Sequence, residues 1–289
     1  MPRGLDHLVV ASRDLAAQAA FYARLGFKVG ARNRHPWGTL NHIVQFDGCF
    51  LELITLEDGF KRPNPGEPVA QFANFLADYV ERRDGFAMLV LESRDAAADQ
   101  ADFVAHGIAG PQTFFFERRG ERPDGTPVHV AFTLAFASSP AIPEAGFFVC
   151  QQHFPESFWN PAYQRHDNGV TGVAAAVMVA DDPLRHAAFL ESYTGGGQVG
   201  RIDGGIAIET PRGRIEVLQP AEIEARFGET PPPGTGPRFA AIRFLVEDVE
   251  RVADRCGAGG ISSRHVGTRL VVPAAAAFGV ILAFERAGR

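Results

Sequence analysis

Cysteine is scarce in this sequence, and its arrangement excludes two common classes of site. The three cysteines, Cys49, Cys150 and Cys256, are odd in number and lie far apart in the 289 residues. A disulfide framework needs paired cysteines, and zinc or thiol redox sites commonly need a Cys-x-x-Cys pair, which is missing. The sequence therefore predicts three buried, reduced thiols.

Basic clusters and long apolar runs are also missing. The formal net charge is −6, with 28 Lys and Arg residues scattered among 34 Asp and Glu. Nucleic acids and anionic membranes bind proteins through a basic face, so neither is expected as a partner. The longest apolar runs, residues 173–180 and 274–284, are too short to cross a bilayer, and the N-terminus has no apolar stretch resembling a secretory signal. We expect a cytoplasmic protein.

The motifs of several large enzyme classes do not occur: no Gly-rich phosphate loop, serine nucleophile elbow or Cys/His catalytic pair stands out. Hydrophobic residues make up 46%, which is enough to bury a sizeable core. The 24 phenylalanines concentrate at residues 114–116 and 147–148 and are expected to pack in that core. An aromatic cup would also favour an uncharged or aromatic ligand over a phosphate. The charged run 117–122 is interpreted as a solvated hairpin.

A fixed order of elements repeats along the chain. In the first copy, Leu5–Ala11 is predicted as a strand, Asp14 as the N-cap of a helix over residues 16–25, and Gly26 as the end of that helix. Three more strands are then predicted, at residues 27–33, 40–46 and 49–56. The order is β-α-β-β-β.

The same order recurs three times. The predicted first strands and capping residues are 86–91 with Asp95, 173–180 with Asp182, and 239–246 with Asp248. The spacing from the capping aspartate to the closing glycine matches the first copy in the second and fourth copies and differs by one residue in the third. Four agreements in element order indicate a true repeat.

A single βαβββ unit would leave one sheet face bare, so the units are expected to pair. The predicted fold is α+β: four βαβββ modules that pair into two curled eight-stranded sheets with the helices outside. We assign the N-terminal pair to residues 1–155, a connection to residues 156–169 and the C-terminal pair to residues 170–289. The sequence leaves open whether the protein forms a homodimer.

A chain of βαβββ units that opens with Leu-Asp-His-Leu-Val at residues 5–9 resembles the vicinal oxygen chelate superfamily, which includes glyoxalase I, extradiol dioxygenases, and fosfomycin-resistance and bleomycin-binding proteins. More narrowly, the chain resembles the glyoxalase-like domain proteins. Residues 35–41, 50–54 and 163–169 add to this resemblance. It implies the fold more strongly than any one reaction.

The resemblance implies a divalent metal on the concave face of the first cup. His7 on the first strand and Glu52 on the last strand occupy ligand positions, because alternate strand residues point into the cup. An imidazole and a carboxylate suit Fe, Mn, Zn, Ni or Co. The candidates for a third ligand, all from the second copy, are His129, His153, Gln151 and Gln152.

The other copies do not supply an equivalent histidine. The position of His7 is taken by Met88, Ala175 and Ala241 in the second, third and fourth copies. Met88 is therefore assigned to the ligand-contacting residues, and the C-terminal pair is predicted to lack a metal site. Two ligands seldom hold a metal in a cell, so His7 and Glu52 could instead hydrogen-bond each other or a polar ligand.

Residues 35–41, His-Pro-Trp-Gly-Thr-Leu-Asn, are expected at the rim of the first cup. Trp37 could stack on a ligand there, with Thr39 and Asn41 orienting it. The alternative is a hairpin corner in which Trp37 packs and Asn41 bonds to the backbone.

Three functions follow as hypotheses, each with a small molecule as partner. The first is a metal-dependent lyase, isomerase or dioxygenase that acts on a small oxygenated, partly apolar compound, with Glu52 as metal ligand or base. The second is a metal-free protein that binds or sequesters a small molecule, as resistance proteins do. The third is metal-free acid–base catalysis by Glu52 with His7 as its partner.

Overall fold

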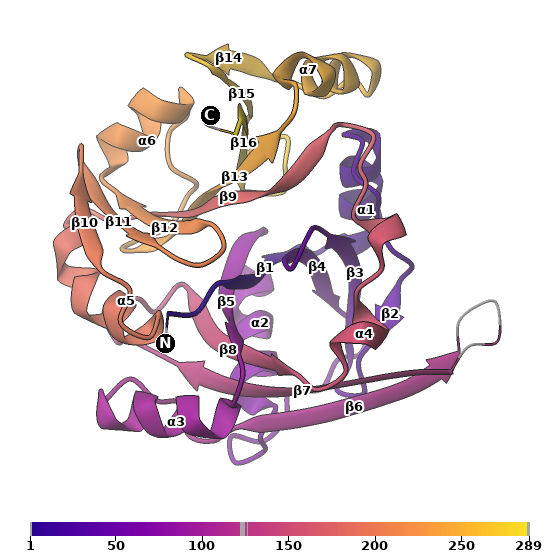
Figure 1. Cartoon of the computed structure of the whole chain (residues 1–289), viewed down its shortest axis with the longest axis vertical. Helices are drawn as coiled ribbons and strands as arrows, with labels where there is room; N and C mark the ends of the chain where they lie inside the picture. The colour runs from indigo at the N-terminus through magenta and orange to yellow at the C-terminus, as the bar shows by residue number, and fades with distance from the viewer. Residues whose placement is uncertain (1, 122–124, 126, 288–289) are drawn as a thin grey trace.

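The computed structural model describes residues 2–121, 125 and 127–287, which form two eight-stranded sheets (Figure 1). The first sheet contains, in the order of hydrogen-bonded neighbours, β2 (Asn33–Arg34), β3 (Thr39–Gln45), β4 (Phe50–Leu56), β1 (Leu5–Ala11), β5 (Gly85–Ser93), β8 (Gly146–Gln152), β7 (Pro127–Ala137) and β6 (Phe114–Glu121). The second contains β10 (Val199–Ile202), β11 (Gly205–Glu209), β12 (Arg214–Leu218), β9 (Val170–Val179), β13 (Arg238–Val246), β16 (Ile281–Arg286), β15 (Arg269–Val272) and β14 (Arg264–Val266).

Each half of a sheet is one βαβββ module. β1 runs parallel to β4, β5 runs parallel to β8, and the antiparallel pairing of β1 with β5 joins the two modules. β9, β12, β13 and β16 repeat this arrangement in the second sheet. The module helices are α1 (Leu15–Arg24), α3 (Ala96–Ala105), α5 (Ala187–Tyr193) and α7 (Val249–Ala258). The predicted fold, four modules paired into two eight-stranded sheets, is confirmed.

Capping aspartates start the module helices as expected in three of the four modules. The side chains of Asp14, Asp95 and Asp248 each accept a hydrogen bond from a backbone N–H in the first turn. In the third module Asp182 makes no such bond, and the 3-10 helix η2 (Pro183–His186) precedes α5. The helical segment of this module, η2 and α5 together, is one residue longer than α1, which matches the altered spacing.

The predicted strand over residues 27–33 is wrong in extent. Only Asn33 and Arg34 form a strand there, and residues 28–32 run without regular pairing. The N–H of Gly30 still donates to the carbonyl of Ile43, so the segment stays beside β3. This irregular backbone lets Gly30 contribute to a cavity wall.

Two further helices lie on the inner faces of the sheets, although every helix was expected outside. α2 (Ala70–Arg82) links the modules of the first sheet, and its apolar residues Leu76 and Tyr79 pack with Val9 and Met88. α6 (Pro220–Phe227) does the same in the second sheet through Ile223 and Phe227 against Val177. Each linking helix fills part of a cup, because an amphipathic helix buries its apolar face against whatever apolar surface the sheet leaves open.

The opposite faces of the sheets share one hydrophobic core. Phe244 of β13 packs against Phe27 and Phe46, with ring centroids 5.3 and 5.9 Å apart. The buried hydroxyl of Tyr193 at the end of α5 lies 2.7 Å from the carbonyl of Leu89 and 2.8 Å from that of Phe148. The second sheet therefore braces the strands that carry the site. No helix in the described part of the chain is long and apolar enough to span a membrane.

Replacing Tyr193 with phenylalanine should lower the free energy of unfolding by about 1–3 kcal/mol, because a hydroxyl that bonds to buried carbonyls is removed while its ring is kept. Urea unfolding followed by circular dichroism measures the change. Tyr163→Phe is the control, since Tyr163 is 39% exposed. Equal stabilities of the two variants would contradict the bracing role.

Candidate functional site

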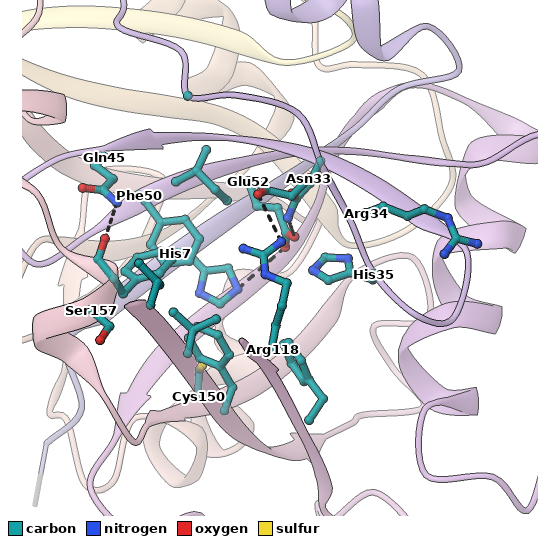
Figure 2. Close-up of a pocket in the computed structure, with 18 of the residues that line it drawn as sticks. His7, Asn33, Arg34, His35, Gln45, Phe50, Glu52, Arg118, Cys150 and Ser157 are labelled. Atoms are coloured by element: carbon teal, nitrogen blue, oxygen red, sulfur yellow. Dashed lines mark hydrogen bonds and ion pairs between the residues drawn. The ribbon is translucent and has the colours of Figure 1, made fainter. Parts of the chain in front are cut away.

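A cavity of about 340 Å³ occupies the part of the first cup that α2 leaves open (Figure 2). All the strands of the first sheet except β5 contribute side chains to its wall, and the segment after β8 covers one side. Its polar and charged lining residues are His7, Asn33, Arg34, His35, Asn41, Gln45, Glu52, Arg118, Ser157 and Asn160. The rest of the wall is largely aromatic and aliphatic, so a ligand would meet few polar groups.

His7 meets Asp6 because β1 is bulged at this point. Leu5 pairs with Leu91 and His7 with Val90, so Asp6 is an extra residue with no partner on β5. A bulge turns neighbouring side chains out of strict alternation. Consequently Nδ1 of His7 lies 2.6 Å from Oδ1 of Asp6, although the two residues are adjacent in the chain.

The imidazole of His7 is also held from its face and its far edge. It stacks on Phe50 with ring centroids 4.3 Å apart and planes inclined by 11°, and Phe148 approaches it edge-on. The second carboxylate oxygen of Asp6 accepts a hydrogen bond of 2.8 Å from Nε2 of Gln152. A carboxylate at Nδ1 favours the tautomer that carries its proton there, so Nε2 of His7 can accept a proton.

Glu52 faces His7 across the base of the cavity (Figure 2). Its Oε2 lies 4.0 Å from Nε2 of His7, which is too long for a direct hydrogen bond. Its Oε1 accepts a hydrogen bond of 2.5 Å from Nδ2 of Asn41. Both Glu52 and His7 are buried, at 6% and 5% exposure, so a small group placed between them would be shielded from water.

The rim segment stacks two aromatic rings beside this pair. His35 and Trp37 lie parallel with ring centroids 4.5 Å apart, and Nδ1 of His35 lies 2.7 Å from Oγ1 of Thr39. Burial lowers the pKa of His35, while the negative charge of Glu52 opposes that shift. Among the described residues, Nε1 of Trp37 is buried without a hydrogen-bond partner. Thr39 thus lies behind the wall and orients His35.

The connection between the two sheets covers one side of the cavity. It contains α4 (Pro155–Phe158) and the 3-10 helix η1 (Pro161–Tyr163). The side chain of Gln45 donates to the carbonyl of Phe158 over 2.9 Å and accepts from the N–H of Asn160 over 3.0 Å. His166 receives the N–H of Lys28 at Nδ1 and lies with Nε2 2.9 Å from the carbonyl of Gln45. These bonds fix the connection to β3.

The structure brings together four of the residues singled out in the sequence: His7, Trp37, Asn41 and Glu52 all line the cavity. The other residues lie elsewhere. Met88 is packed beneath α2, with 2% exposure. Nε2 of His129 lies 2.7 Å from Oε2 of Glu117, and Nε2 of His153 lies 2.8 Å from Oγ1 of Thr133, both away from the cavity.

The donor atoms do not fit a resident metal ion of the kind that the superfamily implies. Such sites commonly use at least three protein ligands, and no group of three His, Cys, Asp or Glu side chains that could hold a metal occurs in the described ranges. The strand register relates His7 to Met88 and Glu52 to Phe148 in the paired module. Both counterparts are apolar, so the pair of modules supplies two donors where a symmetric site would supply four.

Cys150 also lines the cavity, but its thiol is expected to be unreactive. Burial raises the pKa of its thiol well above the usual value, and the negative charges of Asp6 and Glu52 add to that shift. The thiol therefore stays protonated at neutral pH.

Reasoning from the sequence missed several residues of the site, among them Asp6 behind His7 and the lining residues Gln45 and Arg118. Asp6 was overlooked because strict strand alternation places it on the face opposite His7, and Gln45 because nothing in its neighbours marks a contact to the connection. Arg118 was assigned to a solvated hairpin, yet it lines the cavity. Its signal was the alternation of Phe114, Phe116 and Arg118 on β6, which puts all three side chains on one face.

The chain matches the family described as "Glyoxalase-like domain" over residues 5–194 and belongs to that family. The matched residues include both modules of the first sheet and the cavity. No curated protein matches the chain.

The family match agrees with the resemblance to glyoxalase-like domain proteins that the sequence predicted, and several solved structures share the fold. A hypothetical protein from Staphylococcus aureus has a TM-score of 0.66 and 12% identity, over 99% of this chain and 100% of that one. A mutant of 4-hydroxymandelate synthase from Streptomyces coelicolor has a TM-score of 0.57 and 13% identity, over 100% of this chain and 94% of that one.

A fusion of a xylose isomerase-like TIM barrel with 4-hydroxyphenylpyruvate dioxygenase also aligns, with a TM-score of 0.57 and 13% identity. All of this chain aligns with 49% of that one, so the chain spans about half of the fusion protein. At these identities the likeness shows the shared fold.

Acidification should loosen the connection over the cavity through His166. Burial lowers the pKa of His166 below its usual value, and its Nδ1 accepts an N–H, which a protonated imidazole could not do. The unfolded chain therefore binds the proton more readily, and stability should fall as the pH drops below about 6.5, the usual histidine pKa. Urea unfolding at pH 7.5 and 5.5 measures the loss.

His166→Gln should reduce this dependence on pH without removing it, because burial also lowers the pKa of His35 and His186. His106→Gln is the control, since His106 is exposed and lies on α3's outer end. A His166 variant that keeps the full pH dependence of the wild type would contradict this assignment.

Proposed function

We propose that the first cup binds a small, oxygenated, partly aromatic compound and moves a proton on it, as a lyase or isomerase does, with His7 and Glu52 as the acting groups. The observation that carries the proposal is the bond of 2.6 Å between Asp6 and His7, which leaves Nε2 of His7 facing Glu52 across 4.0 Å at the buried base of the cavity.

His7 is suited to accept a proton from the substrate. Asp6 orients the ring and stabilises the positive charge that appears when Nε2 takes up a proton, as a carboxylate does for other catalytic histidines. Stacking on Phe50 and the edge of Phe148 prevent the ring from turning. The histidine is thus placed before a ligand arrives.

Glu52 is suited to handle the second proton or to accept a substrate hydroxyl. Asn41 occupies one of its oxygens, so the other remains directed toward His7. A C–H or O–H group lying between Nε2 and Oε2 could lose its proton to one of them and regain one from the other. The two steps together would shift a double bond or eliminate a neighbouring group.

The walls define the rest of the ligand. Phe116, Phe132, Phe148 and Phe158 surround the space with rings that suit an aromatic or other flat apolar body. The volume of about 340 Å³ lies at the lower end of known ligand pockets, so a single-ring compound fits best.

The proposal includes a cytoplasmic location, with which the buried, reduced cysteines agree.

Hydrogen–deuterium exchange tests the proposal without knowledge of the substrate. A panel of small aromatic ketones and hydroxy ketones, such as phenylacetone, is incubated with the protein in D₂O and followed by NMR. The wild type should exchange protons next to the carbonyl of at least one compound, and His7→Gln and Glu52→Gln should each lower that rate by about 100-fold or more. His153→Gln is the control, because His153 lies outside the cavity.

Metal dependence is examined with the same assay. The neighbours named as a dioxygenase fusion and a 4-hydroxymandelate synthase motivate a metal-dependent alternative. We expect the exchange to survive dialysis against a chelator. Exchange that is lost on chelation and restored by Fe, Mn, Zn, Ni or Co would overturn the metal-free mechanism, as would an absence of exchange with every compound.

The second candidate function is binding without turnover, as in sequestering proteins. The apolar counterparts Met88 and Phe148 favour it, because they leave the site with two polar groups in a mainly apolar cup. Saturable binding of panel compounds that His7→Gln weakens, with no exchange in the wild type, would select this function over the first.

A further inference from the structure

Two arginines line the cavity, and Arg118 differs from Arg34 because Arg34 is paired with Glu57. Arg118 lies on β6 two residues after Phe116, and both side chains line the cavity. Figure 2 shows Arg118 beside His35 and His7. Its Nη1 donates a hydrogen bond of 3.1 Å to Oδ1 of Asn33, which comes from the opposite edge of the sheet. The guanidinium therefore reaches across the cavity from β6 towards β2.

The guanidinium of Arg118 has no carboxylate partner within salt-bridge distance among the described residues. Nearby charges are paired with others: Arg34 bonds to Glu57 over 2.6 and 2.8 Å, and Glu117 lies beside His129. Arginine stays protonated in proteins, so this charge persists.

The immediate surroundings make that charge unusual. Although Arg118 is exposed as a whole residue, burial lowers the pKa of its guanidinium. The negative charge of Glu52 raises the pKa of His35, and the positive charge of Arg118 lowers it. Both charges therefore act within the same cavity. A partly desolvated cation without a counter-ion is a place where an anion binds well.

We propose that Arg118, steadied by Asn33, binds the carboxylate of an aromatic monocarboxylic acid whose ring lies among the phenylalanines. This inference rests on the proposed function, because it takes the first cup as the ligand site and adds the class of ligand. A single guanidinium matches one carboxylate by paired N–H···O bonds. A second negative group deeper in the cavity would meet the carboxylates of Glu52 and Asp6, so a phosphate or dicarboxylate is disfavoured.

Tryptophan fluorescence provides the readout. The chain has two tryptophans: Trp37 lines the cavity, and Trp159 packs on the cavity residue Phe50 with ring centroids 5.9 Å apart. The probes are 3-phenylpropionate and 3-phenylpropionamide, which have nearly the same shape and differ in charge. The wild type should bind the acid about tenfold or more tightly than the amide, and added salt should reduce the difference.

Arg118→Gln should bring the two affinities within about twofold of each other by weakening the acid alone, since the amide does not depend on the charge. Arg119→Gln is the matched control, because it removes the same charge from the next residue of β6, whose side chain is exposed on the other face. It should keep the preference for the acid, and Arg118→Lys should keep part of it.

The outcomes separate this inference from the proposed function. Equal affinity of the acid and the amide in the wild type, no binding of either probe, or an unchanged preference in Arg118→Gln would each overturn the role of Arg118. His7→Gln should keep the preference for the acid while losing proton exchange. Arg118→Gln should still exchange the protons of a neutral ketone. That result would support the proposed function even if the wild type showed no preference for acids.

Discussion

The antiparallel pairing of β1 with β5 across a bulge is the constraint on which the site depends. In each module the first strand carries an extra residue at the equivalent place against its partner strand: Asp6, Ala87, Ala174 or Ala240; β9 has a second one, Thr171. The bulge turns that residue and its successor toward neighbouring space. In the first module these two residues are Asp6 and His7, so a feature of the backbone creates a bonded acid–histidine pair. In the other modules the same geometry presents only small or apolar side chains.

The two cups therefore have the same architecture and different chemistry. Glu216 of β12 holds the register position of Glu52, but Arg243 and Arg214 form ion pairs with it, and Arg243 and Arg269 bind Glu285 in turn. These ion pairs neutralise the carboxylates of the second cup. In the described part of the first cup no arginine pairs with Asp6 or Glu52: Asp6 bonds to His7 and Gln152, and Glu52 bonds to Asn41.

The repeat explains how much of this could be read from the sequence. The spacing of Asp14 and Gly26 recurs, so the modules followed from the sequence. Their pairing followed from the sheet face that a single unit leaves bare, and the positions of His7 and Glu52 followed from the superfamily resemblance together with strand alternation. Other features depend on contacts between distant segments. α2 enters the cup because of the shape left by the paired modules, and Asp6 joins His7 only through the bulge, which no local residue pattern marks. Arg118 did carry a local signal, the alternation after Phe114, but its charged neighbours favoured a solvated strand.

The distribution of charge limits what the first cup can bind. Asp6 and Glu52 are buried and receive hydrogen bonds from the amides of Gln152 and Asn41, which are neutral and so do not cancel their charge. A ligand group that enters between His7 and Glu52 must therefore bring a proton that it can donate, since an anion there would be repelled. Among the described residues, Arg118 is the lining arginine without a carboxylate partner, so the proposed anion lies beside it. The same ligand can meet both demands when its acidic group and its exchangeable proton lie at opposite ends of a short apolar body, which is the shape that the aromatic walls accommodate.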